Sequence, residues 1–279
     1  MQIVFHPDNY LCALNNRYFI EIAYNGKLYH GWQIQKNAIS VQEVLNKALS
    51  TIFRQNIKTV GCGRTDSGVH ARQLYAHFDL SEILNDAGKE NLIPLTPDSR
   101  IIASLNSILP YDIAVKKIIE VRADAHARFD ALKRSYEYHM HFEKDPFKVG
   151  FSWLLRDKPD IDLMNRGARV IMEYLDYSCF SKSNTQTFTN NCRISKAEWQ
   201  VKEGSMIFYI SADRFLRNMV RAIVGTLVQV GRGEIQMDDL RNIIESKNRS
   251  NAGMSVPACG LYLTEVEYPF IEKRVSFLD

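Results

Sequence analysis

The sequence predicts an α+β protein in which two units with the element order β-α-β-β-α-β follow one another along the chain. Short segments with alternating apolar residues are typical of strands, and longer segments with one apolar face are typical of helices. Both kinds of segment occur in the same order in the two halves, although the halves share no residue-level repeat. This order is that of a ferredoxin-like arrangement. We therefore expect a mainly antiparallel sheet with helices on one side, whose open face and groove between the halves bind something large.

The N-terminal half is predicted to span residues 17–121, after an N-terminal extension of residues 1–16 that shows no clear periodicity. Residues 17–24 alternate as a strand. Ser40 is predicted to begin a helix, because Glu43 follows at the spacing of a capping box and one apolar face continues to residue 53. The remaining elements of this half are strands over 58–62 and 73–80, a helix over 99–109 that Pro110 ends, and a strand over 113–121.

The C-terminal half is predicted to span residues 122–279 and to repeat this order. Glu203 and Gly204 are placed at the turn of a hairpin, and Gly231 is placed at the end of a strongly apolar helix. The predicted elements are a strand over 134–142, a helix over 160–175, strands over 193–201 and 206–212, helices over 215–230 and 237–246, and a strand over 260–268.

Composition restricts the class of protein only loosely. The net charge of +3 is too small to indicate nucleic-acid binding by itself, so a basic surface requires local clustering. The sequence contains no apolar run long enough to span a membrane and no signal-peptide pattern at its start. The five cysteines lack metal-ligand or redox spacing and are predicted to be free thiols in a reducing cytoplasm. Nucleotide hydrolysis, redox chemistry and zinc hydrolysis lose support, because their motifs are missing from the sequence.

The nonapeptide GRTDSGVHA at residues 63–71 carries the strongest functional signal. It places Asp66 between two glycines, where a backbone can turn tightly, and two residues after Arg64. The residue types alone leave two interpretations open, a structural Asx-turn or a displayed reactive carboxylate. Nothing in the sequence fixes the direction of His70, so a structural or hydrogen-bonding role is favoured for that side chain.

Two further segments offer groups that suit a nucleotide site. If residues 214–221 form one helix, then Arg214, Arg217 and Arg221 share a face with Asn218. They form either a solvated basic stripe or a source of one arginine that turns inward as the bidentate partner of a carboxylate, which favours the ionised acid. Tyr136 alternates with a second tyrosine on one strand, so it either packs in the core or stacks on a base. Residues 256–263 indicate only a turn that enters a strand.

These four segments, in this order, resemble the A-type tRNA pseudouridine synthases, the TruA family. Residues 24–33, 40–42 and 126–129 also resemble the family, and the resemblance covers residues 17–268. It implies the pseudouridine synthase fold, with a catalytic cleft at the centre of the sheet. It also implies a cofactor-free and metal-free isomerase that converts uridine to pseudouridine at positions 38, 39 and 40 in the anticodon stem-loop of tRNA. Members of the family are usually homodimers.

The resemblance also assigns roles to particular residues. Asp66 matches the essential catalytic acid, Arg221 matches the arginine that pairs with it, and Tyr136 matches the tyrosine that stacks on the target base. Arg64 matches an arginine that assists base flipping, and Leu261 matches an apolar residue that walls the pocket.

Arg217 is predicted to contact an RNA phosphate. The sequence departs from the commonest family pattern at Ser67, where alanine is frequent, and at Asn218, where histidine is frequent. Two alternatives remain, a pseudouridine synthase with another RNA target or a non-catalytic RNA-binding protein on the same scaffold. The joint presence of Asp66, Arg221 and Tyr136 argues against the non-catalytic alternative.

Overall fold

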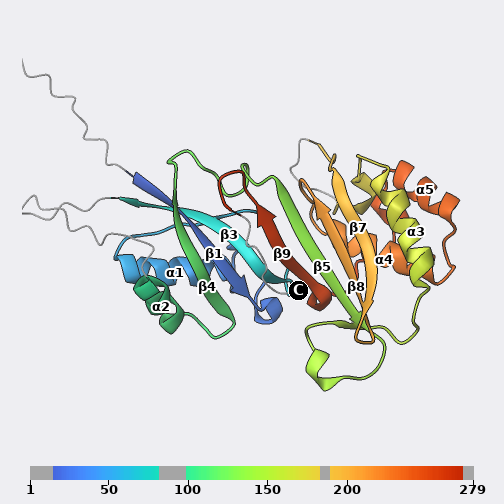
Figure 1. Cartoon of the computed structure of the whole chain (residues 1–279), viewed down its shortest axis with the longest axis horizontal. Helices are drawn as coiled ribbons and strands as arrows, with labels where there is room; N and C mark the ends of the chain where they lie inside the picture. Colours follow the sequence, from blue (N-terminus) through green and yellow to red (C-terminus); the bar gives the residue numbers. More distant parts are fainter. Residues whose placement is uncertain (1–14, 82–98, 183–188, 273–279) are drawn as a thin grey trace, which may run out of the picture.

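The computed structural model describes residues 15–81, 99–182 and 189–272 and is an α+β protein (Figure 1). Its described strands form one nine-stranded sheet with the order β4-β1-β3-β9-β5-β8-β7, while β2 pairs with β3 and β6 pairs with β5. Two pairs of strands are parallel, β3 with β9 and β5 with β6, and the others are antiparallel. The prediction of a mainly antiparallel sheet is therefore confirmed.

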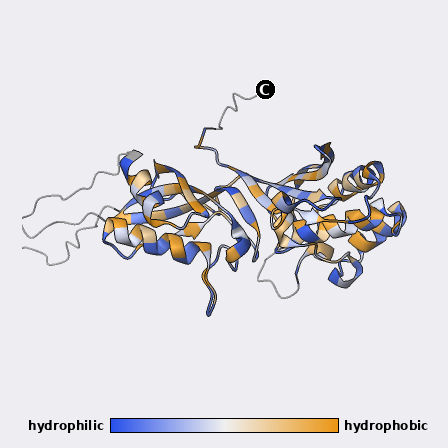
Figure 2. Ribbon diagram, turned by 90° about the horizontal axis from the view of Figure 1, so that it is seen from below, coloured by the Kyte–Doolittle hydropathy of each residue, from blue (hydrophilic) through white to orange (hydrophobic). Residues whose placement is uncertain are grey.

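The N-terminal half supplies one end of this sheet, in the order β4-β1-β3-β2. The Ser40 hydroxyl accepts a hydrogen bond from the Glu43 N–H at 3.2 Å, so the helix begins where the capping pattern predicted. In the left half of Figure 2 the helices form a layer along one side of the strands. The elements are β1 (Asn15–Tyr24), α1 (Val41–Phe53), β2 (Val60–Gly61), β3 (His70–Ser81), α2 (Ser99–Ile108) and β4 (Ile113–Val121).

The C-terminal half supplies the other end of the sheet, in the order β9-β5-β8-β7, which is the order of the first half repeated. Its central helix, α4, is buried along almost its whole length and packs against α3. The elements are β5 (Lys133–His141), β6 (Trp153–Leu154), α3 (Ile161–Met172), β7 (Ile194–Lys202), β8 (Ser205–Ala212), α4 (Met219–Gly231), α5 (Met237–Glu245) and β9 (Leu261–Glu267).

Several predicted boundaries were wrong. The strand β1 begins at Asn15, so residues 15 and 16 belong to the sheet, and residues 1–14 of the predicted extension lie outside the described residues. The helix predicted over 160–175 ends at Met172, after which Glu173 donates to the carbonyl oxygen of Val170 in a tighter turn. The helix predicted from residue 215 begins at Met219, and the short strand β6 was not predicted.

The last strand of the chain joins the two halves. The strand β9 pairs in parallel with β3, His70 opposite Tyr262 and Ala71 opposite Leu263, and it pairs antiparallel with β5. Leu263 and two later residues of the C-terminal half, Val266 and Tyr268, belong to the hydrophobic core of the N-terminal half. The two halves therefore form one continuous sheet, and residues near its centre contact both cores.

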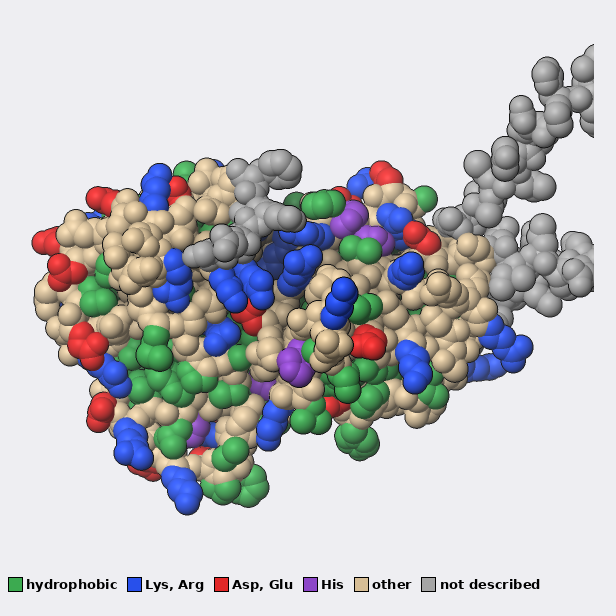
Figure 3. Space-filling view, turned by 180° about the vertical axis from the view of Figure 1, so that it is seen from behind, with side chains coloured by type: hydrophobic (Ala, Val, Ile, Leu, Met, Phe, Trp, Pro, Cys, Tyr) green, Lys and Arg blue, Asp and Glu red, His purple; other side chains and the backbone are tan. Residues whose placement is uncertain are grey.

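Figure 3 shows the face opposite to that of Figure 1. Lys and Arg side chains gather around a hollow near the middle of this face, beside residues drawn in grey. Because the net charge of the chain is only +3, this group of cations is a local concentration of charge rather than a general property of the surface. None of the helices that the structure describes is long and apolar enough to cross a membrane.

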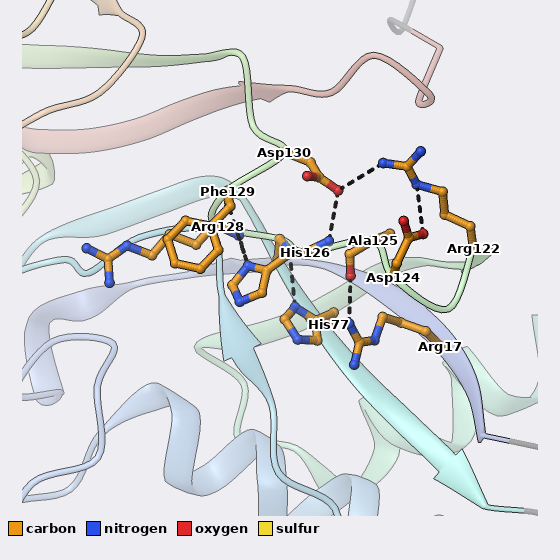
Figure 4. Close-up of polar contacts among 10 residues, drawn as sticks. Arg17, His77, Arg122, Asp124, Ala125, His126, Arg128, Phe129 and Asp130 are labelled. Carbon is orange, nitrogen blue, oxygen red and sulfur yellow. Dashed lines mark hydrogen bonds and ion pairs between the residues drawn. The ribbon is translucent and has the colours of Figure 1, made fainter. Parts of the chain in front are cut away.

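A buried histidine lies where β3 meets the segment before β5 (Figure 4). The Nδ1 atom of His77 accepts a hydrogen bond from the Ala127 N–H at 3.1 Å, so the ring is neutral and its hydrogen is on Nε2. The pKa of His77 is lowered to about 4, chiefly by burial and then by the Arg17 cation and His126, against the opposite effect of Asp79 and Asp130. The ring therefore stays neutral in the folded protein at pH values where the unfolded chain binds a proton.

We expect His77 to make the folded protein less stable as the pH falls from about 6.5 to about 4. In this window only the unfolded state binds the proton, so His77 costs stability with a slope that approaches about 1.4 kcal/mol per pH unit. Above the window neither state binds it, and below the window both do. Urea unfolding of wild type and His77→Asn at pH 7, 6 and 5 measures this slope. Asparagine keeps an acceptor for Ala127, and an equal pH dependence in both proteins contradicts the prediction.

Candidate active site

The candidate acid lies on the loop between β2 and β3, residues 62–69, which we call the active loop. The loop turns tightly at Asp66, because the Val69 N–H donates to the Asp66 carbonyl oxygen at 3.2 Å and Gly68 has a φ of +79°. The Asp66 side chain is 25% exposed, and its two carboxylate oxygens face two arginines. The structure thus favours the displayed carboxylate over the Asx-turn.

The segment after β1 holds the active loop in place. The Gly68 N–H donates to the Tyr29 carbonyl oxygen at 3.2 Å, and the Trp32 N–H donates to the Thr65 carbonyl oxygen at 3.3 Å. Gly31 lies between these contacts with a φ of +84°, and a Cβ atom at this position would overlap the Thr65 carbonyl oxygen. A glycine is therefore required for this close approach.

His70 directly follows the active loop and has a structural role, as the sequence favoured. Its Nδ1 atom accepts the Gly26 N–H at 3.1 Å, so Nε2 carries the hydrogen and donates to the Gly150 carbonyl oxygen at 3.1 Å. The ring stacks between Phe151 and Tyr262. Burial lowers the pKa of His70, and both ring nitrogens are already occupied. This arrangement leaves His70 no free nitrogen to act as a catalytic base.

Two arginines share the Asp66 carboxylate, one at each oxygen. The Nη1 atom of Arg221 lies 3.6 Å from Oδ2, and the Nε atom of Arg217 lies 3.8 Å from Oδ1. Arg221 thus pairs with Asp66, as the resemblance implies, but neither arginine is within hydrogen-bond distance, so the bidentate geometry of the inward-turned alternative is not formed. Arg221 is 20% exposed and Arg217 is 60% exposed, so one cation is fixed by the protein and the other faces solvent.

The two arginines do not lie on one helix face as the sequence predicted. Arg217 precedes α4, and Asn218 has the left-handed conformation with a φ of +67°. The physical reason lies in Asp213, whose carboxylate accepts the N–H groups of Arg193 and Arg214 at 2.8 and 2.7 Å. A side chain that binds backbone donors in this way competes with helix formation. The segment 213–218 is therefore a loop that brings Arg217 to Asp66 from outside the helix.

Arg221 is oriented by the segment before β9. Its Nε atom donates to the Val256 carbonyl oxygen at 2.7 Å, while the Val256 N–H donates back to the Arg221 carbonyl oxygen at 3.3 Å. Arg249 holds this segment through hydrogen bonds to Gly253 at 3.0 Å and to Ser255 at 2.9 Å. Because Nε is engaged with Val256, the remaining guanidinium nitrogens are the ones that can face the carboxylate.

Tyr136 and Tyr138 lie on one face of β5, as the strand pattern predicted, but in different surroundings. Tyr138 is fully buried and donates to the Pro257 carbonyl oxygen at 2.9 Å, so it is a packing residue. Tyr136 is half-buried and meets the ring of Phe215 edge to face, with centroids 5.1 Å apart. Burial raises the pKa of the Tyr136 phenol, and the negative charge of Asp66 contributes, so its hydroxyl stays protonated.

The other predicted residues, Leu261 and Arg64, differ in their surroundings. Leu261 is buried at the start of β9, opposite Tyr138 of β5. Arg64 is exposed on the active loop itself. The structure therefore brings Asp66 together with Arg217 and Arg221, and it places Leu261 on the strand that pairs with the strand of Tyr136. Within the described ranges, no group of three or more His, Cys, Asp or Glu side chains is arranged to hold a metal ion.

Sequence reasoning missed the residue that connects these parts, Arg134. Its Nη2 atom donates to the carbonyl oxygens of Cys62 at 3.0 Å and Arg128 at 2.6 Å, and its Nη1 atom donates to those of Ala131 and Asp213 at 2.8 Å each. The sequence indicated only a basic residue beside Tyr136. No signal in the pattern identifies carbonyl partners that lie up to 79 residues away.

The chain is similar to known proteins over most of its length. A family model described as tRNA pseudouridine synthase matches residues 175–269, which include Arg217, Arg221 and Leu261. The chain is 49% identical over 254 residues to the tRNA pseudouridine synthase A of Bacteroides fragilis, covering 91% of this chain and 96% of that protein. It is 47% identical to the protein of the same name from Azobacteroides pseudotrichonymphae over 91% of this chain and 97% of that one.

The class defined by the family model is thus a pseudouridine synthase of tRNA. A more distant relative, the tRNA pseudouridine synthase A of Clostridium acetobutylicum, is still 35% identical over 89% of this chain and 98% of that protein. With identities of this size over nine-tenths of its length, the chain belongs to the tRNA pseudouridine synthase A family, which is a family of isomerases.

Proposed function

We propose that this protein converts uridine to pseudouridine at positions 38, 39 and 40 in the anticodon stem-loop of tRNA, the reaction that its family resemblance implies. One observation carries the proposal: the Asp66 carboxylate is displayed on a tight turn, with one arginine facing each oxygen. The repeated order of strands in the two halves supports an origin as two ferredoxin-like units, residues 17–121 and 122–279, with the catalytic cleft between them.

The chemistry fits a site that acts through a carboxylate alone. The bond between C1′ and N1 of the nucleotide breaks, the base turns, and C1′ bonds to C5, from which a proton leaves while N1 gains one. No electrons enter or leave overall, so the balance requires no redox cofactor. Asp66 either attacks the substrate or assists in removing a proton from the sugar, and the two cations beside it favour the ionised carboxylate from which both routes start.

Four further residues have proposed roles in binding the substrate. Tyr136 stacks on the flipped uracil and Leu261 walls the pocket, which suits their positions on the paired strands β5 and β9. Arg64 assists flipping from its exposed position two residues before Asp66. Arg217 contacts a phosphate when RNA is bound, which its 60% exposure favours.

We also propose that the protein acts as a homodimer in the cytoplasm. Both properties come from the family resemblance, and the cytoplasm is where tRNA is found. The buried thiols of Cys62, Cys179 and Cys192 are consistent with a reducing compartment.

Replacing Asp66 with asparagine is expected to abolish the reaction and spare binding. Asparagine has the same shape as the acid but can act neither as nucleophile nor as base. We expect no tritium release from tRNA labelled at uridine C5, with a Kd for tRNA that changes by less than about tenfold, or 1.4 kcal/mol. The exposed Asp162 of α3 provides the control, since Asp162→Asn leaves the site untouched. Near-normal turnover by folded Asp66→Asn protein contradicts the assignment.

The two arginines are expected to differ in their effect. Arg221→Ala removes the buried partner of Asp66 and lowers kcat by orders of magnitude, whereas Arg217→Ala mainly raises the Kd for tRNA. Removing a phosphate contact also reduces the slope of log Kd against log salt by about one. Single-turnover rates and salt titrations separate these effects, and melting temperatures check that both variants fold. Equal and small effects from both substitutions argue against the assigned roles.

Substitutions of Tyr136 test its stacking role. Phenylalanine keeps the aromatic face, and leucine removes the stacking contribution of about 1–3 kcal/mol per base. We expect turnover to decrease in the order wild type, Tyr136→Phe, Tyr136→Leu, with a similar thermal stability for wild type and the Phe variant. A folded and fully active Tyr136→Leu protein removes this residue from the site.

A further inference from the structure

Residues 125–131, which precede β5, form a loop that several side chains fix by hydrogen bonds, and we call it the platform loop (Figure 4). His77 Nδ1 accepts the Ala127 N–H, and His126 Nδ1 accepts the N–H groups of both Arg128 and Phe129, at 3.1 and 3.3 Å. Asp130 closes the turn by accepting the His126 N–H at 2.9 Å. Three successive backbone donors are thus bound by imidazole acceptors, which fixes the conformation of the loop at Arg128 and Phe129.

Side chains from β1, from β5 and from the residue after β9 anchor the carbonyl oxygens of the same loop. The Tyr268 hydroxyl donates to Ala127 at 2.5 Å, and Arg17 donates to Ala125 at 3.0 Å. Arg134 binds the carbonyl oxygens of Arg128 and Ala131. Loops are usually the more mobile parts of a fold, so this number of anchors is evidence for a preorganised surface rather than a simple connection.

The platform loop presents an aromatic ring and a cation to solvent. Phe129 is 74% exposed, with the ring of His126 4.2 Å from its own and the Arg128 guanidinium 5.8 Å away. Among the ion pairs of the described residues, none involves Arg128 or Arg64. The nearby acids, Asp124 before the loop and Asp130 within it, face Arg122 instead, at 3.1 and 3.7 Å.

The platform loop lies next to the active loop. One nitrogen of Arg134 bonds to the carbonyl oxygens of both Cys62 and Arg128, so these two backbone segments lie within the reach of a single atom. Cys62 is followed at once by Gly63 and Arg64, and then by the loop of Asp66. The exposed ring and the unpaired cation therefore stand beside the active loop, on a part of the fold that the roles assigned above leave unused.

We propose that Arg128 and Phe129 form a second nucleotide-binding site, which holds a nucleotide of the tRNA other than the target uridine. Phe129 stacks on its base, and Arg128 contacts its phosphate. A lone exposed aromatic residue is common on protein surfaces and carries no such conclusion by itself. The rigid mounting, the unpaired cation and the adjacent active loop together fit single-stranded or unstacked RNA. This inference rests on the proposed function.

The first test measures tRNA binding in the Asp66→Asn protein, where no reaction follows. We expect Phe129→Ala to raise the Kd for tRNA by about 5- to 100-fold, Phe129→Leu to do nearly the same, and Phe129→Tyr to stay within about twofold. Arg128→Gln is expected to reduce the salt slope by about one, which Phe129→Ala does not do. Phe147 provides the matched control, since it is 91% exposed and lies on a separate turn, residues 146–148, which follows β5.

The second test separates stacking from a structural effect. An anticodon stem-loop is prepared with single abasic nucleotides, one position at a time, and its Kd is measured with Phe129 and with Phe129→Ala. If Phe129 stacks on one base, loss of that base weakens binding to the Phe129 protein by about 5-fold or more. The same loss has little effect on the alanine variant. Additive effects at every position overturn the proposal, as does an unchanged Kd for folded Phe129→Ala.

A third measurement addresses the other class of partner for this surface. If Phe129→Ala changes the sedimentation of the protein without RNA, the surface is a contact between copies of the chain, and the proposal is wrong. Failure of the proposed function is distinguishable from this outcome, because it leaves the wild-type protein without tritium release. Failure of the further inference leaves wild-type turnover intact and tRNA affinity insensitive to Phe129.

Discussion

The guanidinium group of Arg134 connects the parts on which the site depends. From β5 it donates to backbone carbonyl oxygens in the active loop, in the platform loop and at the start of the segment that carries Arg217. Arginine suits this position, since it stays charged throughout the physiological pH range and its hydrogen bonds are charge-assisted. The three segments have no regular secondary structure of their own. One side chain of a central strand, two residues before Tyr136, therefore joins all three segments directly.

The two arginines beside Asp66 differ in how firmly the protein holds them. Arg221 projects from a buried helix and is oriented by Val256, so its place beside Asp66 is built into the fold. Arg217 reaches the same carboxylate from a loop and faces solvent. If Arg217 turns away from Asp66, the ion pair of Asp66 with Arg221 remains. This difference between the two cations suits the separate roles that we propose for them.

The sequence predicted those features of the protein that depend on local pattern. The capping residue Ser40, the alternating strands and the order of elements in both halves needed only neighbouring residues, and the family resemblance pointed to Asp66. The predicted start of α4 was wrong because Asp213 binds backbone donors before the helix. Apolar periodicity does not reveal this preference. The two arginines on one carboxylate, the Val256 contact and the links of Arg134 all join segments far apart in the chain. Single-sequence patterns contain no information about such contacts.

The parallel pairing of β9 with β3 has a consequence for how the protein is made. This strand comes from the end of the chain, yet it supplies Leu263 and Val266 to the core of the N-terminal half. During synthesis the N-terminal half emerges first, before the strand that pairs with His70 and Ala71 at the start of β3 has been made. The ribosome has to synthesise the C-terminal half as far as β9 before this pairing with β3 can form. A chain that stops before residue 261 therefore lacks the strand that pairs with His70 and Ala71, the two residues that directly follow the active loop.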